Sequence, residues 1–195
     1  MVINKITLTS AVRNGNLVMS QNINSNDAFF DEEIKRIKRL LAQLQPGKVP
    51  LSIFSEIARL TVMSVIEVVP FTFEANGNIK VLLLRRDDND PTWPGMCHVP
   101  GGIVLPTDMT EDFRESLARV IAKLGATKIS KPVFVQNVFC QVRRGAEVAL
   151  VYSVAITGEP AVGALYDVQS LPPNMIEGQA NFVHIAAAHY KQQNQ

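Results

Sequence analysis

A glycine-containing loop followed by one amphipathic helix constrains the fold of this chain most strongly. The loop reads Trp93-Pro-Gly-Met-Cys-His-Val-Pro-Gly-Gly102. Apolar side chains then recur at the spacing of one buried helical stripe, at Phe113, Leu117, Val120, Ile121 and Leu124. Gly125 follows directly, and glycine commonly ends a helix because it adopts the left-handed conformation without strain. The pattern predicts a helix from about Thr110 that ends at Gly125 and buries one face.

Strand patterns lie on both sides of this loop and helix. The predicted strands cover residues 64–73, 79–86, 133–142 and 148–157. Asn76-Gly77 lies between the first two, and this dipeptide favours the tight turn of a hairpin. The unbroken apolar run Val81–Leu84 indicates a strand covered on both faces. Residues 166–172 read as a loop and residues 181–190 as a closing helix, and this order of elements is typical of an α/β domain.

The first part of the chain has the pattern of an extension. Asn14-Gly15 predicts the turn of a short hairpin, and Asp27 is placed to cap a helix that ends at Pro46-Gly47. A second short helix is predicted over residues 51–60. The first helix carries an apolar stripe made of Ile34, Ile37, Leu40, Leu41 and Leu44. We therefore predict an extension over residues 1–61, which offers a contact for a homodimer, and a main domain over residues 62–195.

Composition excludes several classes of function. The chain has 195 residues and a net charge of +1, and no basic stripe stands out, which argues against a general nucleic-acid or membrane-surface binder. No apolar run approaches the length of a membrane span without a charge or a Pro/Gly break. The two cysteines do not form a disulfide framework, so a reducing, cytoplasmic location is expected.

The Pro100-Gly-Gly102 entrance and the helix that ends at Gly125 resemble the Nudix box of the MutT-like Nudix hydrolases. The motif of that family reads G-x5-E-x7-R-E-U-x-E-E-x-G-U, where U is aliphatic. The resemblance implies a Nudix-like α/β/α sandwich with a mixed sheet over roughly residues 62–190. The interval from Gly102 to Gly125 is two residues longer than the motif allows, and residues 103–109 can hold the insertion because loops tolerate it.

The charged residues of this motif are replaced in the chain. When the helix is aligned backward from Gly125, its Arg-Glu pair falls on Ala118 and Arg119, and its Glu-Glu pair on Ala122 and Lys123. Anchoring instead on Arg114-Glu115 puts Ala118 and Arg119 at the Glu-Glu positions and leaves Gly125 unexplained. Both registers lose the paired glutamates, so the resemblance implies a Nudix fold with a degenerate active site.

The resemblance also implies a nucleotide-like ligand, since Nudix proteins typically act on a nucleoside diphosphate linked to another group. Six residues before the helix are candidate ligand contacts: Arg85, Arg86, Trp93, His98, Gly101 and Gly102. At most one of the two arginines is expected to face a pocket, because alternate side chains of a strand point opposite ways. The alternative is that both are surface arginines that end the strand. Trp93 can stack on a base or ribose or anchor the loop, and His98 can contact the ligand or be a packing residue.

The helix itself offers two cations, Arg119 and Lys123, which lie four residues apart on one helical face. There they can bind a diphosphate or another anion directly, without a metal. The alternative is that Arg119 pairs with Glu115 and that Lys123 simply favours the end of the helix.

A magnesium site would have to be built from other acids. The candidates for catalysis are Glu111 and Glu115, and those for metal binding are Glu111, Asp112 and Glu115. Acidic residues in a first helical turn also complement the helix dipole without binding a metal. Two hypotheses follow. The first is a pyrophosphohydrolase that uses Mg²⁺ at a relocated site, and the second, which we favour, is a module that binds a nucleotide-like ligand or a protein without a cofactor.

Overall fold

The computed structural model describes residues 10–13, 16–19, 28–75, 77–108, 113–125 and 128–193, and it divides into two compact units, Met1–Leu44 and Gln45–Gln195. In the first unit, β1 (Ser10–Arg13) pairs antiparallel with β2 (Asn16–Met19), as the hairpin prediction requires. The turn residues Asn14 and Gly15 lie outside the described residues. Helix α1 (Ala28–Leu41) follows, with Ile37, Leu40 and Leu41 exposed along it.

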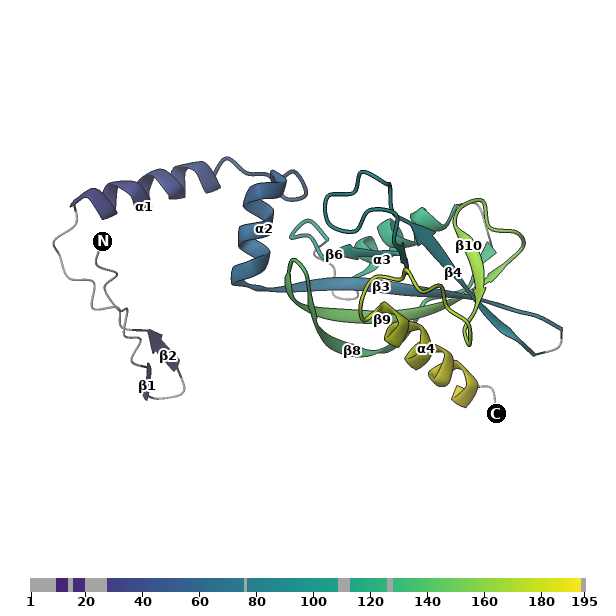
Figure 1. The fold of residues 1–195 in the computed structure, drawn as a ribbon. Helices are drawn as coiled ribbons and strands as arrows, with labels where there is room; N and C mark the ends of the chain where they lie inside the picture. The colour runs from purple at the N-terminus through teal and green to yellow at the C-terminus, as the bar shows by residue number, and fades with distance from the viewer. Residues whose placement is uncertain are drawn as a thin grey trace. The chain divides into compact units, whose positions relative to one another are not determined.

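The second unit is built around β3 (Val62–Phe73), the long strand in the middle of the sheet (Figure 1). β3 pairs antiparallel with β4 (Ile79–Arg85) and with β6 (Gly101–Ile103). On its other side it runs parallel to β9 (Gly145–Thr157). β9 in turn pairs antiparallel with β8 (Val133–Val142) and with the short β7 (Lys128–Ile129). The sheet is therefore mixed, as predicted.

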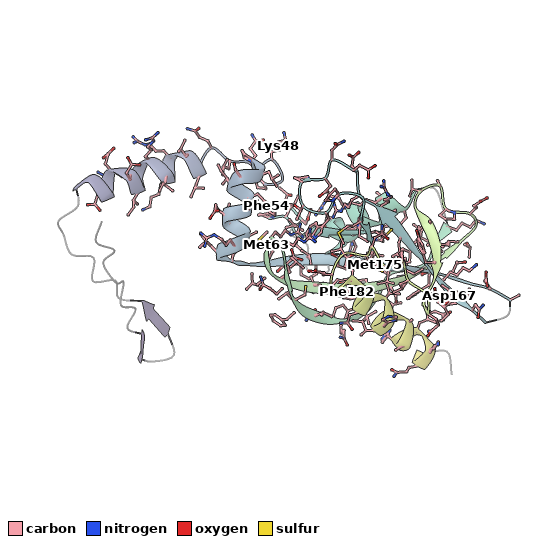
Figure 2. All side chains as sticks on the ribbon, viewed as in Figure 1. Lys48, Phe54, Met63, Asp167, Met175 and Phe182 are labelled. Carbon is pink, nitrogen blue, oxygen red and sulfur yellow. The ribbon has the colours of Figure 1, made fainter. Side chains whose placement is uncertain are left out.

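Helices cover both faces of this sheet and complete an α/β/α sandwich (Figure 1). On one face, Val120 and Leu124 pack with Ile66 and Val68 of β3; on this side lies α3 (Arg114–Ile121). On the opposite face, Val65 and Val69 pack against α4 (Gln179–Gln193). Figure 2 labels Met175 and Phe182, which belong to this second layer. Alternate residues of β3 thus enter different cores, because successive side chains of a strand point to opposite faces.

Helix α2 (Leu51–Leu60) lies in the same unit as the sheet, although the sequence prediction assigns it to the extension. Its Ala58 is fully buried, and its backbone lies against the start of β9. A Cβ atom on Gly145 would lie within 2.8 Å of the Ala58 carbonyl carbon, and Gly145 has a φ of +149°. Glycine at this position therefore allows the helix to approach the strand.

The glycine after the amphipathic helix has the predicted role. α3 continues into a 3₁₀ turn, Ala122–Leu124, and Gly125 ends it with a φ of +76°. The helix begins at Arg114, directly after Phe113, which has a left-handed φ of 55°. Residues 109–112 lie outside the described part, so the predicted start near Thr110 falls there.

The prediction of a loop over residues 166–172 is wrong at its beginning. Residues Ala164–Asp167 form β10, which pairs antiparallel with β4 at the edge of the sheet. Two residues of the glycine loop, Cys97–His98, also form a short strand, β5, against β4. Such short strands carry too few residues for an alternating pattern to be recognised. In the described ranges, none of the helices has the length and apolar character needed to cross a membrane.

Candidate functional site

The Gly-Gly segment of the loop lies directly over a buried carboxyl group. β6 pairs with β3 so that Gly101 is opposite Glu67. A Cβ atom on Gly101 would lie within 2.5 Å of the Glu67 carboxyl carbon. A larger residue would therefore have to displace that carboxyl group, which gives a local reason for glycine at this position.

Glu67 is 6% exposed and lies among apolar residues of β3. Burial, and next the nearby Glu147 carboxylate, raise its pKa from 4.5 to about 8, while Arg144, Arg86 and Lys123 act in the opposite direction. Glu67 is therefore protonated at neutral pH. Desolvation disfavours the charged form of a carboxyl group, and a like charge adds to the effect.

Glu147, at the start of β9, is also buried but has a charged partner. Its Oε1 accepts a hydrogen bond from Arg144 Nε at 2.5 Å. The guanidinium of Arg144 lies 5.1 Å from the ring centroid of Trp93, and that of Arg86 lies 5.9 Å from it. Trp93 is itself 6% exposed. It is thus a buried loop residue with two guanidinium groups near its ring, and an aromatic face attracts nearby cations.

The two arginines at the end of β4, Arg85 in the strand and Arg86 directly after it, lie in different surroundings, as expected because successive side chains along a strand point opposite ways. Arg85 is exposed and forms an ion pair with Asp88. Arg86 is half-buried, and its Nη1 lies 3.6 Å from Asp90 Oδ2. Arg86 is therefore the member of the pair that belongs to this site.

The two cations of the helix contact the backbone of the glycine loop. Arg119 donates to the carbonyl oxygen of Ile103 at 2.9 Å and also pairs with Asp108. Lys123 donates to the carbonyl oxygen of Gly101. The pKa of Lys123 is lowered, first by partial burial and then by the charge of Arg86. Both cations thus lie along the segment Gly101–Ile103.

Asp108 fixes the position of Arg119. It accepts hydrogen bonds from the Ser116 hydroxyl at 2.5 Å and from the Leu105 backbone N–H at 2.9 Å. Burial raises the pKa of this carboxyl group, but the hydrogen bonds from Ser116, Leu105 and Arg119 outweigh it, so the pKa is lowered. Asp108 is therefore ionised and holds the guanidinium against the loop.

His98 is 7% exposed, which agrees with a packing residue. Its Nδ1 donates to the carbonyl oxygen of Val99 at 2.7 Å, since a carbonyl oxygen only accepts. Burial, and next the charge of Arg86, lower its pKa to about 4. His98 is neutral at physiological pH and adds no charge to the site.

Three buried polar atoms of this region have no hydrogen-bond partner among the described residues: Glu67 Oε2, Arg86 Nε and Arg119 Nε. Buried polar groups are normally paired, because leaving one unpaired costs roughly 1–3 kcal/mol. Two of these three atoms, Arg86 Nε and Arg119 Nε, are hydrogen-bond donors that belong to cationic side chains. Two guanidinium groups, each with a nitrogen atom unpartnered in the described part of the chain, thus lie beside the glycine loop.

Of the three acids predicted at the start of the helix, only Glu115 belongs to the described part of the chain. Glu115 lies exposed in the first turn of α3. Glu111 and Asp112 fall outside the described residues. In the part of the chain that the structure describes, no three His, Cys, Asp or Glu side chains gather in a way that could hold a metal ion.

The sequence analysis did not predict a role for Glu67 or Arg144. One signal was present: Glu67 interrupts an apolar strand, Val65-Ile-Glu-Val-Val69, and a lone carboxyl group in a buried strand requires an explanation. Glu147 lies on β9, which runs parallel to β3, and a local pattern does not reveal that these two strands are neighbours.

Similarity to solved structures identifies the fold. The Nudix domain of NrtR from Shewanella oneidensis, solved with ADP-ribose, matches with a TM-score of 0.54 and 17% identity over 78% of this chain and 97% of that domain. NrtR with a 27mer DNA matches with a TM-score of 0.52 and 19% identity over 66% of this chain. A possible asymmetric diadenosine tetraphosphate hydrolase from Jonesia denitrificans matches at 0.50 and 20%, over 68% of this chain and 96% of that one.

The chain therefore has the Nudix fold, as the Pro-Gly-Gly entrance and the helix ending at Gly125 predicted. It spans 62% of the length of the NrtR chain that was solved with DNA. No protein-family model matches the chain. No curated protein matches it either.

Proposed function

We propose that this protein is a Nudix-fold binding module that takes a nucleotide-like ligand by its diphosphate group, without hydrolysing it. The observation that carries the proposal is the placement of Arg119 and Lys123 on the carbonyl oxygens of Ile103 and Gly101. Two fixed cations thus line the glycine loop. The half-buried Arg86 adds a third, and its Nε and that of Arg119 are donors without a partner in the described chain.

These cations favour direct anion binding over metal-dependent chemistry. Guanidinium and ammonium groups form strong hydrogen bonds to phosphate oxygens, and a guanidinium can contact two oxygens at once. Mg²⁺ needs several oxygen ligands around it, and it activates water only where such ligands hold it near the phosphate. Cations beside the loop repel Mg²⁺ and supply neither a ligand nor an activated water.

The structural relatives support the ligand class. The Nudix domain of NrtR was solved with ADP-ribose, which contains a diphosphate between two ribosyl groups. We therefore propose ADP-ribose and related nucleoside diphosphates as first ligands to test. The competing hypothesis is a hydrolase whose Mg²⁺ lies at Glu115 together with Glu111 and Asp112. The two unpaired cysteines suit a reducing, cytoplasmic setting for either function.

Calorimetry with ADP-ribose, in EDTA and in Mg²⁺, tests the proposal. We expect the same affinity in both buffers and a lower affinity at high salt, because salt screens interactions between exposed charges. Each charge-assisted hydrogen bond contributes about 1.5–3 kcal/mol, so Arg119→Ala with Lys123→Ala should weaken binding by at least about tenfold. The control is Arg59→Ala with Lys128→Ala, two exposed cations, which should leave the affinity unchanged.

Three results would count against the proposal. Binding that appears only with Mg²⁺ would indicate a metal-dependent site. Unchanged affinity in the Arg119/Lys123 double variant, with a normal thermal unfolding curve, would place the ligand elsewhere. Turnover of ADP-ribose that is lost in Glu115→Gln would establish the competing hydrolase and its relocated metal site.

A further inference from the structure

β8 forms an open edge of the sheet in the second unit. One side of β8 pairs with β9 from Val133 to Val142, and no strand of the described chain pairs with its other side. The outward N–H and C=O groups of an edge strand remain available to another strand. β8 is ten residues long, so this open edge is long.

The side chains of β8 lack the features that normally protect such an edge. Its sequence, VFVQNVFCQV, contains no charged residue and no proline. Natural edge strands commonly carry charges, prolines or a short length, which prevent pairing with other chains. Phe139 is 80% exposed and Phe134 is 46% exposed. An uncharged edge with exposed aromatic rings indicates a surface that pairs rather than one that avoids pairing.

The exposed aromatic residues lie on one face of the strand. Phe134, Asn137 and Phe139 are opposite Tyr152, Leu150 and Val148 of β9, so all three are on the face of the sheet that α3 partly covers. The ring of Phe134 meets that of Tyr152 edge to face, with centroids 5.4 Å apart. An irregularity between Phe134 and Gln136 inserts one extra residue, which keeps Phe134 on this face.

The strand is self-complementary about Asn137. When the bulged pair Val135–Gln136 counts as one position, antiparallel pairing centred on Asn137 puts Phe134 of one copy opposite Phe139 of the other. The same register puts Val138 opposite the bulged pair. We propose that β8 pairs with β8 of a second copy of this chain about a twofold axis at Asn137, which joins the two sheets edge to edge. This inference does not depend on the proposed ligand.

Side-chain chemistry supports this register. The twofold axis produces two Phe134–Phe139 pairs per dimer, and cross-strand aromatic pairs stabilise a sheet. An asparagine amide has both donors and an acceptor, so two copies of Asn137 can bond to each other. Beyond the strand, Lys131 falls opposite Val142 and Arg143 opposite Ser130. No like charges therefore oppose each other.

Light scattering on the full-length chain tests the proposal first. We expect a dimer, and we expect Phe139→Lys to raise its dissociation constant by about 30-fold or more, because a charge replaces a central aromatic residue twice per interface. Val162→Lys is the matched control, since Val162 is an exposed apolar residue that lies outside β8, in the loop before β10. Leu41→Glu distinguishes a dimer formed through β8 from one formed through the contact predicted on α1. It should leave the β8 dimer intact.

Cross-linking tests the register. In a Cys140→Ser background, Asn137→Cys places two thiols at the twofold axis, and mild oxidation should link the two copies. Gln141→Cys lies near the end of the same strand, opposite Pro132, and should link far more slowly. Three results would overturn the proposal. The wild-type protein could be monomeric, or its dimer could persist in Phe139→Lys but dissociate in Leu41→Glu. The third is cross-linking of the two cysteine variants at equal rates.

Discussion

Replacing Glu67 by glutamine should stabilise the protein at neutral pH. The folded protein keeps this carboxyl group protonated up to a pKa of about 8, because burial and the Glu147 carboxylate disfavour its charge. In the unfolded chain the group ionises near its ordinary value of 4.5. Glutamine has nearly the same shape as the protonated acid and does not ionise in either state.

The sign and size of the effect follow from proton linkage. Between pH 4.5 and 8 the folded protein holds a proton on Glu67 that the unfolded chain releases. The contribution of Glu67 to the free energy of unfolding is therefore greatest below pH 4.5 and falls as the pH rises. One pKa unit corresponds to about 1.4 kcal/mol, so the free energy of unfolding at pH 7 is lower by about 3 kcal/mol than at pH 4.5 on account of Glu67. Glu67→Gln should remove this loss.

Urea unfolding at several pH values measures the difference, with the fluorescence of Trp93, the single tryptophan, as the probe. We expect Glu67→Gln and the wild-type protein to be similar near pH 4.5 and to diverge up to pH 8. The exposed Glu177→Gln is the control and should follow the wild-type curve. If the difference between Glu67→Gln and wild type does not change with pH, then Glu67 is ionised in the fold and our reasoning is wrong.

Two further substitutions test the packing of the site. Gly101→Ala should destabilise the protein by about 1–3 kcal/mol in thermal unfolding, because its Cβ would overlap the Glu67 carboxyl group. Gly102→Ala should cost less, since its Cβ would meet its nearest atom at 3.2 Å. Equal destabilisation by the two substitutions would contradict this packing. Arg144→Met leaves Glu147 buried without its partner and should cost about 3 kcal/mol or more. Arg59→Met breaks an exposed pair and should cost less than about 1 kcal/mol, so similar losses in the two arginine variants would argue against a buried ion pair.

Local patterns were sufficient to predict the elements that build the layers. The stripe from Phe113 to Leu124 predicted a buried helix face, and the apolar run Val81–Leu84 predicted a strand covered on both sides; both lie in the cores as expected. These predictions succeed because the spacing of apolar residues reports burial directly. The short strand β10 was not predicted, because all four of its residues are exposed or half-buried and give no such spacing.

The candidate site was predictable only in part. Arg119 and Lys123 were recognised as cations on one helical face, because helical spacing alone determines that. Their bonds to the carbonyl oxygens of Ile103 and Gly101 depend on how the loop lies over the helix, and backbone oxygens have no sequence signature. The role of Glu67 depends on residues brought together by the sheet, so it could be recognised only once the strand order was known.

The parallel pairing of β3 with β9 has a consequence for how the chain folds. It aligns Val62 with Ala146 and Phe71 with Ala155, so a long intervening segment must be closed before the two strands meet. The entropy lost on closure grows with the logarithm of loop length, and parallel contacts of this kind form slowly. The β3–β4 and β8–β9 hairpins, which join neighbours in sequence, can form first. During synthesis the central strand must wait for β9 to leave the ribosome, and a chain truncated before Gly145 cannot complete the sheet.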